Sequence, residues 1–406
     1  MKKNSLTTVE DALEHILRSV SGAPTGFEEV TLSDSSGRII TELIKSDINV
    51  PGYNNSAMDG FAVNTDFVAK QEITLPISQV VSAGLLGKEL EPGTAARIFT
   101  GAPIPQGANA VILQEDTEWN DKEVKVFQIP KAGQNIRLYG HDIKQGDVIL
   151  NQGHKLLPQD IGLLASLGIS TVKVYKPLLV AILNTGNELV ASGECLNAGQ
   201  IYESNSFTLE ALLKILGVQI QKFGIVKDDL QSTEQALLDA SEGADCIISS
   251  GGVSVGDSDY VKDAVANLGE LSLWKLAIKP GKPFSFGRVR ETPFFGLPGN
   301  PVAVFVTFLM LVKPYLLKMQ GAISVQSDKY QLPAGFEISK VGNRQEYLRV
   351  RLHRNQQGNQ ELVPFSNQGS SVMTSTSWAD GLAIIPINTK IKKGDLLDFL
   401  PYTGLL

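Results

Sequence analysis

The stretch on which the fold depends reads Asp245-Cys-Ile-Ile-Ser-Ser-Gly-Gly-Val-Ser-Val-Gly-Asp-Ser-Asp-Tyr260. Its apolar residues 246–248 predict a short buried strand, and the glycines that follow predict a turn that exposes backbone N–H groups. Such a turn before a helix suits a phosphate or another oxyanion, whereas Asp257 and Asp259 suit a hard divalent cation. Together these features indicate phosphoester chemistry. The simpler interpretation is a plain strand-to-helix turn capped by Ser254 or Asp257.

Length and net charge limit the classes of protein to which this chain could belong. A chain of 406 residues exceeds one ordinary core, so several domains are expected. The net charge of −7 and the absence of a long basic run argue against a nucleic-acid partner. The N-terminus lacks the apolar core of a secretory signal, and the most apolar run, 302–312, is too short as a helix to cross a bilayer. We therefore expect a cytoplasmic protein without a membrane partner.

The pattern of apolar residues changes along the chain. A capping box starting at Thr7 predicts an N-terminal helix, residues 36–44 predict a second short helix, and residues 73–130 alternate as in a small β-rich unit. Strand and helix patterns then alternate over 176–320, which predicts a doubly wound parallel sheet. Strict alternation over 347–353 predicts a closing β-barrel or sandwich.

Acidic residues follow the predicted strands of the α/β region. Glu188, Asp228 and Asp259 come after three separate apolar runs, and Thr185 immediately follows the first of them. Because ligands of parallel sheets bind beyond the carboxyl ends of the strands, these side chains are expected at one edge. Carboxylates gathered there would need a cation, and oxygen ligands without a Cys/His cluster favour Mg²⁺. Each carboxylate taken singly is equally compatible with a capping or solvated surface group.

Basic residues gather in one stiff segment. Lys275, Lys279 and Lys282 lie among proline and glycine, an arrangement that suits phosphate or oxyanion binding, although isolated lysines are usually solvated. Residues 297–301 predict a rigid helix start at the same edge, or simple helix initiation. Arg349 and Arg351 share the polar face of the late strand, as anion contacts or as ordinary edge charges. The four scattered histidines argue against a histidine triad or a zinc site.

Seven segments together resemble the molybdopterin molybdenumtransferases, the bacterial MoeA proteins and the similar E domain of gephyrin. They occur in family order and extend over nearly the whole chain: Ser56-Ala-Met-Asp-Gly-Phe-Ala62, Thr100-Gly-Ala-Pro-Ile-Pro105, Gly140-His-Asp-Ile143, Asn184-Thr-Gly-Asn-Glu188, Ser249-Ser-Gly-Gly-Val-Ser-Val-Gly-Asp-Ser-Asp259, Lys279-Pro-Gly-Lys-Pro283 and Leu297-Pro-Gly-Asn-Pro301. Any one segment is weak, but the set is highly specific.

The resemblance implies that adenylylated molybdopterin and molybdate bind, that molybdenum is inserted at the dithiolene, and that AMP is released with a divalent cation, usually Mg²⁺. It also implies a homodimer that works with other proteins of the molybdenum cofactor pathway. Catalytic roles carry over to Asp59, Glu188, Asp228, Asp259, Lys275 and Lys279, with Glu188, Asp228 and Asp259 as metal ligands. Substrate-binding roles are expected for Thr100, Asp142, Thr185, Gly251, Gly252, Ser254, Lys282, Pro298, Pro301 and Ser371.

The resemblance also implies a division into four domains. Residues 1–50 and 140–175 form a discontinuous first domain, and 51–139 form a β-rich domain inserted within it. Residues 176–325 form the α/β molybdopterin-binding domain, and 326–406 form a C-terminal β-barrel. In such dimers Asp59, Thr100 and Ser371 act on the cleft of the other protomer.

Two other functions fit parts of the same pattern. Adenylylation of molybdopterin, the preceding step, is carried out by single-domain enzymes similar to residues 176–320 alone, and the extra domains at both ends count against it. A non-catalytic dimeric scaffold or carrier of the cofactor is the other alternative. The density of carboxylates and lysines favours catalysis, because a scaffold groove depends more on apolar anchors.

Overall fold

The computed structural model describes residues 6–20, 26–252 and 260–406, with only the backbone of residues 273 and 274. The chain divides into two compact units. The larger unit contains Met1–Thr41, Gly153–Leu157 and Thr171–Leu406, and the smaller unit contains Glu42–Gln152 and Pro158–Ser170. Each unit is described by itself below. The proposed four-domain boundaries stay a prediction.

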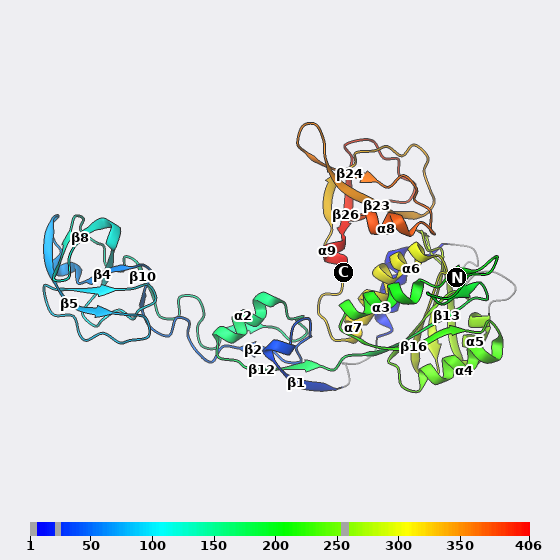
Figure 1. Cartoon of the computed structure of the whole chain (residues 1–406), viewed down its shortest axis with the longest axis horizontal. Helices are drawn as coiled ribbons and strands as arrows, with labels where there is room; N and C mark the ends of the chain where they lie inside the picture. The colour runs from blue at the N-terminus through cyan, green and yellow to red at the C-terminus, as the bar shows by residue number, and fades with distance from the viewer. Residues whose placement is uncertain (1–5, 21–25, 253–259) are drawn as a thin grey trace. The chain divides into compact units, whose positions relative to one another are not determined.

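A six-stranded sheet forms the centre of the larger unit (Figure 1). Its order is β16 (Gln219–Val226), β13 (Leu179–Thr185), β17 (Cys246–Ser250), β21 (Thr292–Leu297), β20 (Pro283–Val289) and β18 (Gly269–Lys275). The first four strands are parallel, as expected, but β20 runs antiparallel to β21. The reason is local: Val289 pairs with Thr292, and a two-residue connection joins only antiparallel strands. Strand β18 is antiparallel to β20 and so runs in the same direction as the first four.

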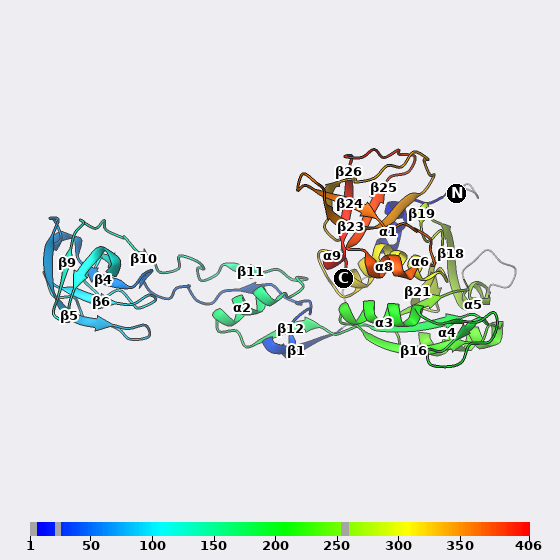
Figure 2. The same ribbon diagram turned by 45° about the horizontal axis from the view of Figure 1, so that its top comes forward.

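Helices cover both faces of this sheet (Figure 2). One face packs against α1 (Val9–Arg18), α3 (Asn205–Ile215) and a long helix built from α6 (Pro301–Thr307), a π-helical turn (Phe308–Val312) and α7 (Lys313–Met319). The other face packs against α4 (Leu230–Ser241) and α5 (Tyr260–Leu268). Strand β13 shows how the two cores form, because Val180 and Ile182 enter the first whereas Ala181 and Leu183 enter the second. The predicted doubly wound arrangement is confirmed.

The N-terminal predictions need two corrections. Helix α1 is capped by Thr8, whose hydroxyl accepts a hydrogen bond from the Asp11 N–H at 3.1 Å, so the cap lies one residue later than expected. Residues 36–44 do not form a helix. Ile39 and Ile40 instead form isolated β-bridges with Lys155 and Val174, pairings distant in sequence that a local pattern does not reveal.

The long apolar helix extends beyond the expected run. Pro301–Met319 is 19 residues long and apolar enough to cross a membrane by length and composition, but 78% of its most apolar window is buried inside the protein. It is therefore a core helix of the larger unit. The π turn precedes Pro314, whose missing N–H and bulky ring disturb regular α-helical bonding.

A second sheet closes the larger unit. Its order is β19 (Ile278–Lys279), β23 (Gln345–Arg354), β25 (Gly381–Ile385), β26 (Leu396–Pro401) and β22 (Tyr330–Pro333), with β24 (Gln360–Pro364) beside β23, and the short helices α8 (Met373–Trp378) and α9 (Tyr402–Leu405) follow β24 and β26. Leu348 and Val350 enter its core, as the alternation predicted. Because β19 carries Lys279 and pairs with β23, this sheet is tied directly to the basic segment.

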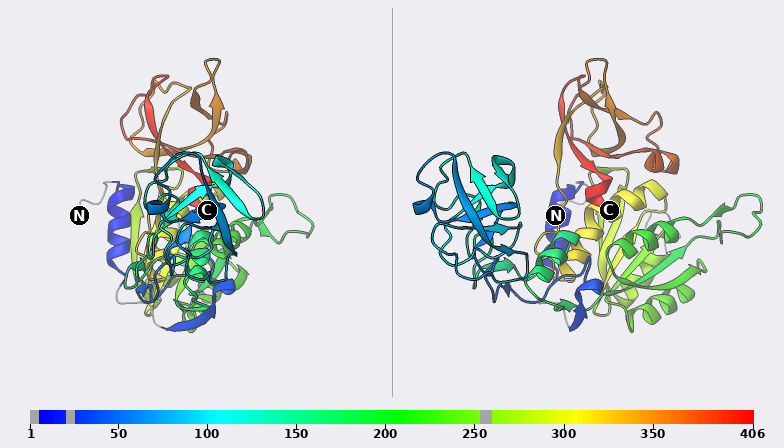
Figure 3. Two further views of the ribbon diagram at one scale, coloured as in Figure 1. Left: turned by 90° about the vertical axis from the view of Figure 1, so that its left-hand side faces the viewer. Right: turned by 60° about the vertical axis from the view of Figure 1, so that its left-hand side comes forward.

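Smaller pairings complete the larger unit. They are β1 (Phe27–Thr31) with β12 (Thr171–Tyr175), the 3₁₀ turn Leu32–Asp34, and β14 (Leu189–Val190) with β15 (Ile201–Tyr202). The green segment that bears β14 and β15 projects away from the central sheet (Figure 3).

The smaller unit contains the predicted β-rich region. Its six-stranded sheet has the order β7 (Ala110–Leu113), β4 (Gly60–Val63), β6 (Ala95–Ile98), β5 (Ile73–Val81), β9 (Glu123–Val126) and β8 (Thr117–Trp119). The remaining elements are β10 (Ile136–Arg137) with β3 (Asn55–Ser56), β11 (Val148–Leu150) with β2 (Ile44–Lys45), helix α2 (Pro158–Ser166), and 3₁₀ turns at Thr65–Phe67 and Gln114–Asp116.

Candidate active-site cleft

A cleft of about 930 Å³ lies at the carboxyl edge of the parallel strands in the larger unit. The segments that follow β13, β16, β17 and β21 contribute to its wall, and so does the segment 368–373 of the C-terminal region. The parallel topology explains this convergence, because strands that run side by side end at the same edge. The predicted site residues in its wall are Thr185, Glu188, Asp228, Gly251, Gly252, Lys279, Lys282, Pro298, Pro301 and Ser371.

The glycine turn after β17 cannot carry side chains without distortion. Gly251 has φ +91°, and a Cβ there would lie 2.6 Å from the Thr185 carbonyl oxygen. Gly252 has φ +65°, and a Cβ there would lie 2.4 Å from Val261. Both glycines line the cleft, so the turn presents bare backbone to a ligand. Ser254, Asp257 and Asp259, predicted from the same loop, lie outside the described residues.

Buried polar atoms without protein partners lie in the wall. Asn184 and Thr185 end strand β13 and are only 2% and 4% exposed, yet Asn184 Oδ1 and Thr185 Oγ1 have no partner among the described residues. Asn205 Oδ1, at the start of α3, is also buried without a hydrogen-bond partner among the described residues. Such groups are costly unless a ligand or water satisfies them. We conclude that this wall is built to meet hydrogen-bonding groups.

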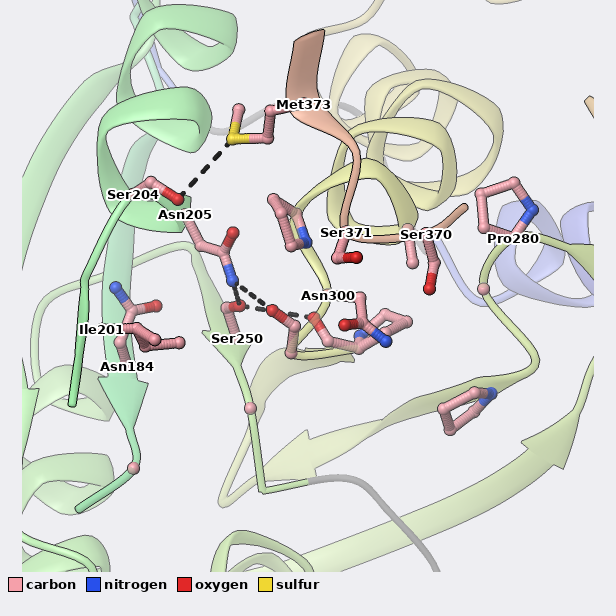
Figure 4. Close-up of a pocket in the computed structure, with 18 of the residues that line it drawn as sticks. Asn184, Ile201, Ser204, Asn205, Ser250, Pro280, Asn300, Ser370, Ser371 and Met373 are labelled. Carbon is pink, nitrogen blue, oxygen red and sulfur yellow. Dashed lines mark hydrogen bonds between the residues drawn. The ribbon is translucent and has the colours of Figure 1, made fainter. Parts of the chain in front are cut away.

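Asn205 also fixes the two neighbouring segments. Its Nδ2 donates to Ser250 Oγ at 2.8 Å and to the Gly299 carbonyl at 2.7 Å (Figure 4). Ser250 Oγ in turn lies 3.4 Å from the Pro298 carbonyl. These bonds join the start of α3 to the ends of β17 and β21. No specific signal in the sequence pointed to Asn205, since an asparagine at a helix start is usually a cap.

Glu188 and Asp228 supply the acidic side. Burial raises the pKa of the Asp228 carboxyl, and the charges of Glu188 and Asp229 raise it further. Asp229 has a different role: it caps α4 by accepting from the Ser232 N–H at 2.8 Å and pairs with Lys227 at 3.1 Å. Asp228 is therefore the residue of this pair that lines the cleft.

The acidic pair fits a magnesium-type ion. Within the described residues, no group of three or more His, Cys, Asp or Glu side chains could hold a metal by itself. Mg²⁺ does not need such a cage, because it commonly uses one or two carboxylates together with water and substrate phosphate oxygens. The charge of Glu188 contributes to the raised pKa of Asp228, and one divalent cation would neutralise both carboxylates.

Two lysines supply the basic side. Lys279 Nζ pairs with Glu346 Oε1 of β23 at 2.7 Å, which anchors the basic segment to the C-terminal sheet. Lys282 is exposed at the cleft, and Arg344, which the sequence did not single out, also lines it. Pro298 and Pro301 flank the start of α6, with Asn300 as the cap residue. The cleft thus places positive charge near the glycine turn.

Lys275 does not belong to the described wall of this cleft. It ends β18, the outermost strand of the sheet, two places away from β21, and its side chain is exposed. Because β18 runs in the same direction as the parallel strands, Lys275 lies at their carboxyl edge, but β20 separates β18 from β21. Its predicted catalytic role stays a prediction.

Arg349 and Arg351 are not free anion contacts. Arg349 is fully buried and donates to Ser375 Oγ at 3.0 Å, to the Tyr347 carbonyl at 3.1 Å and to the Gly369 carbonyl at 3.2 Å. It thereby supports the segment that carries the cleft residues Gly369, Ser370 and Ser371. Arg351 instead stacks over Trp378 at 4.6 Å. Alternation predicted their common face but not the helix and loop that cover Arg349.

The remaining predicted residues belong to the smaller unit. Asp59 Oδ1 accepts from the Thr100 N–H at 2.7 Å and from the Thr100 hydroxyl at 2.8 Å. These bonds lower the pKa of the Asp59 carboxyl, with a further contribution from the charge of Arg97. The pair therefore presents an ionised, oriented carboxylate. Asp142 is exposed in the same unit.

Comparison with known proteins agrees with this geometry. Residues 7–168 match the family described as MoeA N-terminal region (domain I and II), 181–318 match the probable molybdopterin binding domain, and 331–402 match the MoeA C-terminal region (domain IV). The molybdopterin molybdenumtransferase of Haemophilus influenzae is 38% identical over 405 residues, which cover 99% of this chain and all of that protein. A putative molybdopterin biosynthesis protein of Methanocaldococcus jannaschii is 33% identical over 91% of each chain.

Solved structures give the same result. A molybdopterin biosynthesis MoeA protein of Pyrococcus horikoshii superposes with a TM-score of 0.83 at 28% identity, covering 98% of this chain and all of that one. Another solved structure of a molybdopterin biosynthesis MoeA protein from that organism has a TM-score of 0.77 at 32% identity, with the same coverage. The full-length similarity, the three consecutive family regions and the cleft together establish that this chain belongs to the molybdopterin molybdenumtransferase family.

Proposed function

We propose that the protein inserts molybdate into adenylylated molybdopterin and releases AMP, forming molybdenum cofactor. The observation that carries this proposal is the composition of one cleft: a glycine turn, two carboxylates and two lysines meet at the carboxyl edge of a parallel sheet. A substrate with a pyrophosphate link and an oxyanion co-substrate needs this combination of backbone donors, cations and a metal site.

The residues of the cleft have separable tasks in this proposal. Gly251 and Gly252 let the backbone approach the pyrophosphate, while Lys279 and Lys282 neutralise its charge and that of molybdate. Asn184 and Thr185 border the substrate, and their unpartnered side-chain oxygens are available to water or to substrate groups that enter the wall. Stabilising the charge that develops on departing AMP is electrostatic catalysis, and no covalent protein intermediate is required.

Glu188 and Asp228 would hold Mg²⁺, with Asp259 as a further ligand from the loop outside the described residues. When bound, Mg²⁺ would polarise a phosphoryl oxygen and offset negative charge on the leaving phosphate. The raised pKa of Asp228 supports this assignment, because a nearby cation favours the ionised form of two adjacent carboxylates.

We also propose that Asp59 and Thr100 act in the cleft of the partner protomer of a homodimer, as the family resemblance implies. Ser371, which was expected to act across the interface as well, lines the cleft of its own chain. Mixing Asp59→Ala chains with Glu188→Ala chains tests this. If the residues act across the interface, mixed dimers contain one intact site and activity returns from two inactive variants. If each chain builds its whole site alone, every mixed dimer stays inactive.

The direct assay for the function is AMP release from adenylylated molybdopterin with Mg²⁺, with and without molybdate. We expect release that depends on molybdate and falls at least 100-fold in Glu188→Ala, as for removal of a principal electrostatic group. ATP consumption with metal-free molybdopterin would indicate adenylylation instead. Tight binding of the adenylylated substrate without release would indicate a carrier.

A further inference from the structure

A second polar pocket of about 370 Å³ lies in the larger unit, formed by residues outside the cleft wall. Its walls come from residue 155, the start of α7, the segment 322–330 and the C-terminal residues 401–406. The wall is held in place by the Ile323 N–H, which donates to the Gly153 carbonyl at 3.0 Å, and by the close packing of Gly153 on the turn at Gly321. We name it the Lys155–Lys313 pocket after its two cations.

Lys313 is the buried cation of this pocket. It follows the π-helical turn of the long helix and is only 8% exposed. Its Nζ donates to Ser327 Oγ at 3.3 Å, to the Gly404 carbonyl at 3.4 Å and to the Leu405 carbonyl. These partners are all neutral, so they satisfy its donors but leave its charge uncompensated.

Lys155 is the half-buried second cation. It lines the pocket, and no described residue forms an ion pair or hydrogen bond with its ammonium group. Burial lowers the pKa of Lys155, while burial and then the charge of Lys155 lower the pKa of Lys313 to about 8. Two cations therefore repel each other across a space that is open to a ligand, and an anion between them would remove that repulsion.

The other lining groups suit a phosphate group. The hydroxyls of Ser324, Ser327 and Thr403 border the pocket, and Ser327 Oγ, which accepts from Lys313, keeps its own O–H for donation. The lining contains one acidic side chain, Asp328, and the terminal carboxylate of Leu406, and both residues are exposed to solvent. Two lysine charges match the two negative charges of a phosphate monoester, and the volume accommodates a small organic body attached to it.

We propose that the Lys155–Lys313 pocket binds a dianionic phosphate group, free or on a small molecule, at a site separate from the cleft. The ammonium group of Lys155 contacts the phosphate directly, and Ser327 and Thr403 donate hydroxyl hydrogen bonds to it. The buried Lys313, bonded to Ser327, adds positive charge to the wall of the pocket. Since the ligand would bridge the long helix and the C-terminal residues, its binding stabilises the folded state by mass action. The proposal does not depend on the reaction of the cleft.

Residue-resolved acetylation of the full-length protein tests the site without interference from lysines of the cleft. Inorganic phosphate, and separately ribose 5-phosphate, are titrated while acetic anhydride modifies lysines that are then quantified by peptide mass spectrometry. We expect saturable protection of Lys155 of at least fivefold, with less than 1.5-fold protection of Lys329. Lys329 is the matched control because it lies on the same segment but outside the lining of this pocket.

Variants complete the test. Lys155→Gln is expected to weaken phosphate binding at least tenfold by calorimetry, while Lys329→Gln, with the same change of charge, stays within twofold of the parent. Lys155→Arg should retain binding within about threefold, and Thr403→Val, which leaves both lysines in place, should weaken it at least threefold. Equal protection of Lys155 and Lys329, no saturable binding of either probe, or equal affinities of Lys155→Gln and Lys329→Gln would overturn the proposal.

Discussion

Gly251→Ala is the most informative single change in the glycine turn. Gly251 has φ +91°, where a residue with a Cβ is strained by about 1–2 kcal/mol, and the new Cβ would lie 2.6 Å from the Thr185 carbonyl oxygen. Ordinary contact begins at 3.4 Å, so the turn and the end of β13 must separate by about 0.8 Å. Misplacement of about 1 Å in a catalytic site costs on the order of 100-fold in rate.

Gly217→Ala is the matched control. Gly217 has φ +69°, so alanine is strained there too, but its Cβ would meet nothing within 4 Å and the residue is remote from the cleft wall. We expect both variants to lose a few degrees in melting temperature, as a loss of about 1–2 kcal/mol requires. Only Gly251→Ala should lose kcat/KM for molybdate-dependent AMP release, by about 30–100-fold. Full activity in Gly251→Ala, or an equal loss in Gly217→Ala, would refute the reasoning.

Three further predictions concern charged side chains. Lys282→Gln should reduce kcat/KM about 10–100-fold through loss of a charge-assisted contact, whereas Lys329→Gln, outside the cleft wall, should change it less than about twofold. Steady-state kinetics of AMP release compare them. The pKa of Asp228 is raised in the folded state, so its ionisation opposes folding once the pH rises above the pKa of the unfolded chain. Asp228→Asn should therefore be more stable than the parent at pH 7. Chemical denaturation should show that this gain in stability vanishes below about pH 4. The pKa of Lys313 is lowered to about 8 in the folded state. Between about pH 8 and 10.4 this lysine is therefore protonated in the unfolded chain but largely neutral in the folded protein. The stability of the parent should rise with pH across this window, and Lys313→Met should lose that rise.

The central sheet could be predicted from sequence because its signals are local. The apolar run before the glycines forms β17 (Cys246–Ser250), and α5 begins at Tyr260, where the pattern placed a helix. The direction of β20 and β18 could not be predicted in this way, since direction depends on which strands pair and on the short connection between them.

The sequence predicted only those site residues that the parallel topology brings to one edge of the sheet. The residues after β13, β16, β17 and β21 meet because parallel strands end together, and so Glu188 and Asp228 share a cleft. The role of Asn205 was not predicted, and Arg349 was expected as an anion contact or an edge charge. Their roles depend on partners distant in sequence: Ser250 and Gly299 for Asn205, and Gly369 for Arg349. Proximity to Lys279 in sequence does not place Lys275 in the described cleft wall, because β20 separates its strand from β21.

The most direct test of the central claim is a crystal structure of the protein with adenylylated molybdopterin, Mg²⁺ and molybdate. We predict that the pyrophosphate lies against the backbone of Gly251 and Gly252, with Lys279 and Lys282 on its anionic side and the metal at Glu188 and Asp228. The anomalous signal of molybdenum identifies the oxyanion independently. A substrate bound elsewhere while this cleft contains only solvent would contradict the account.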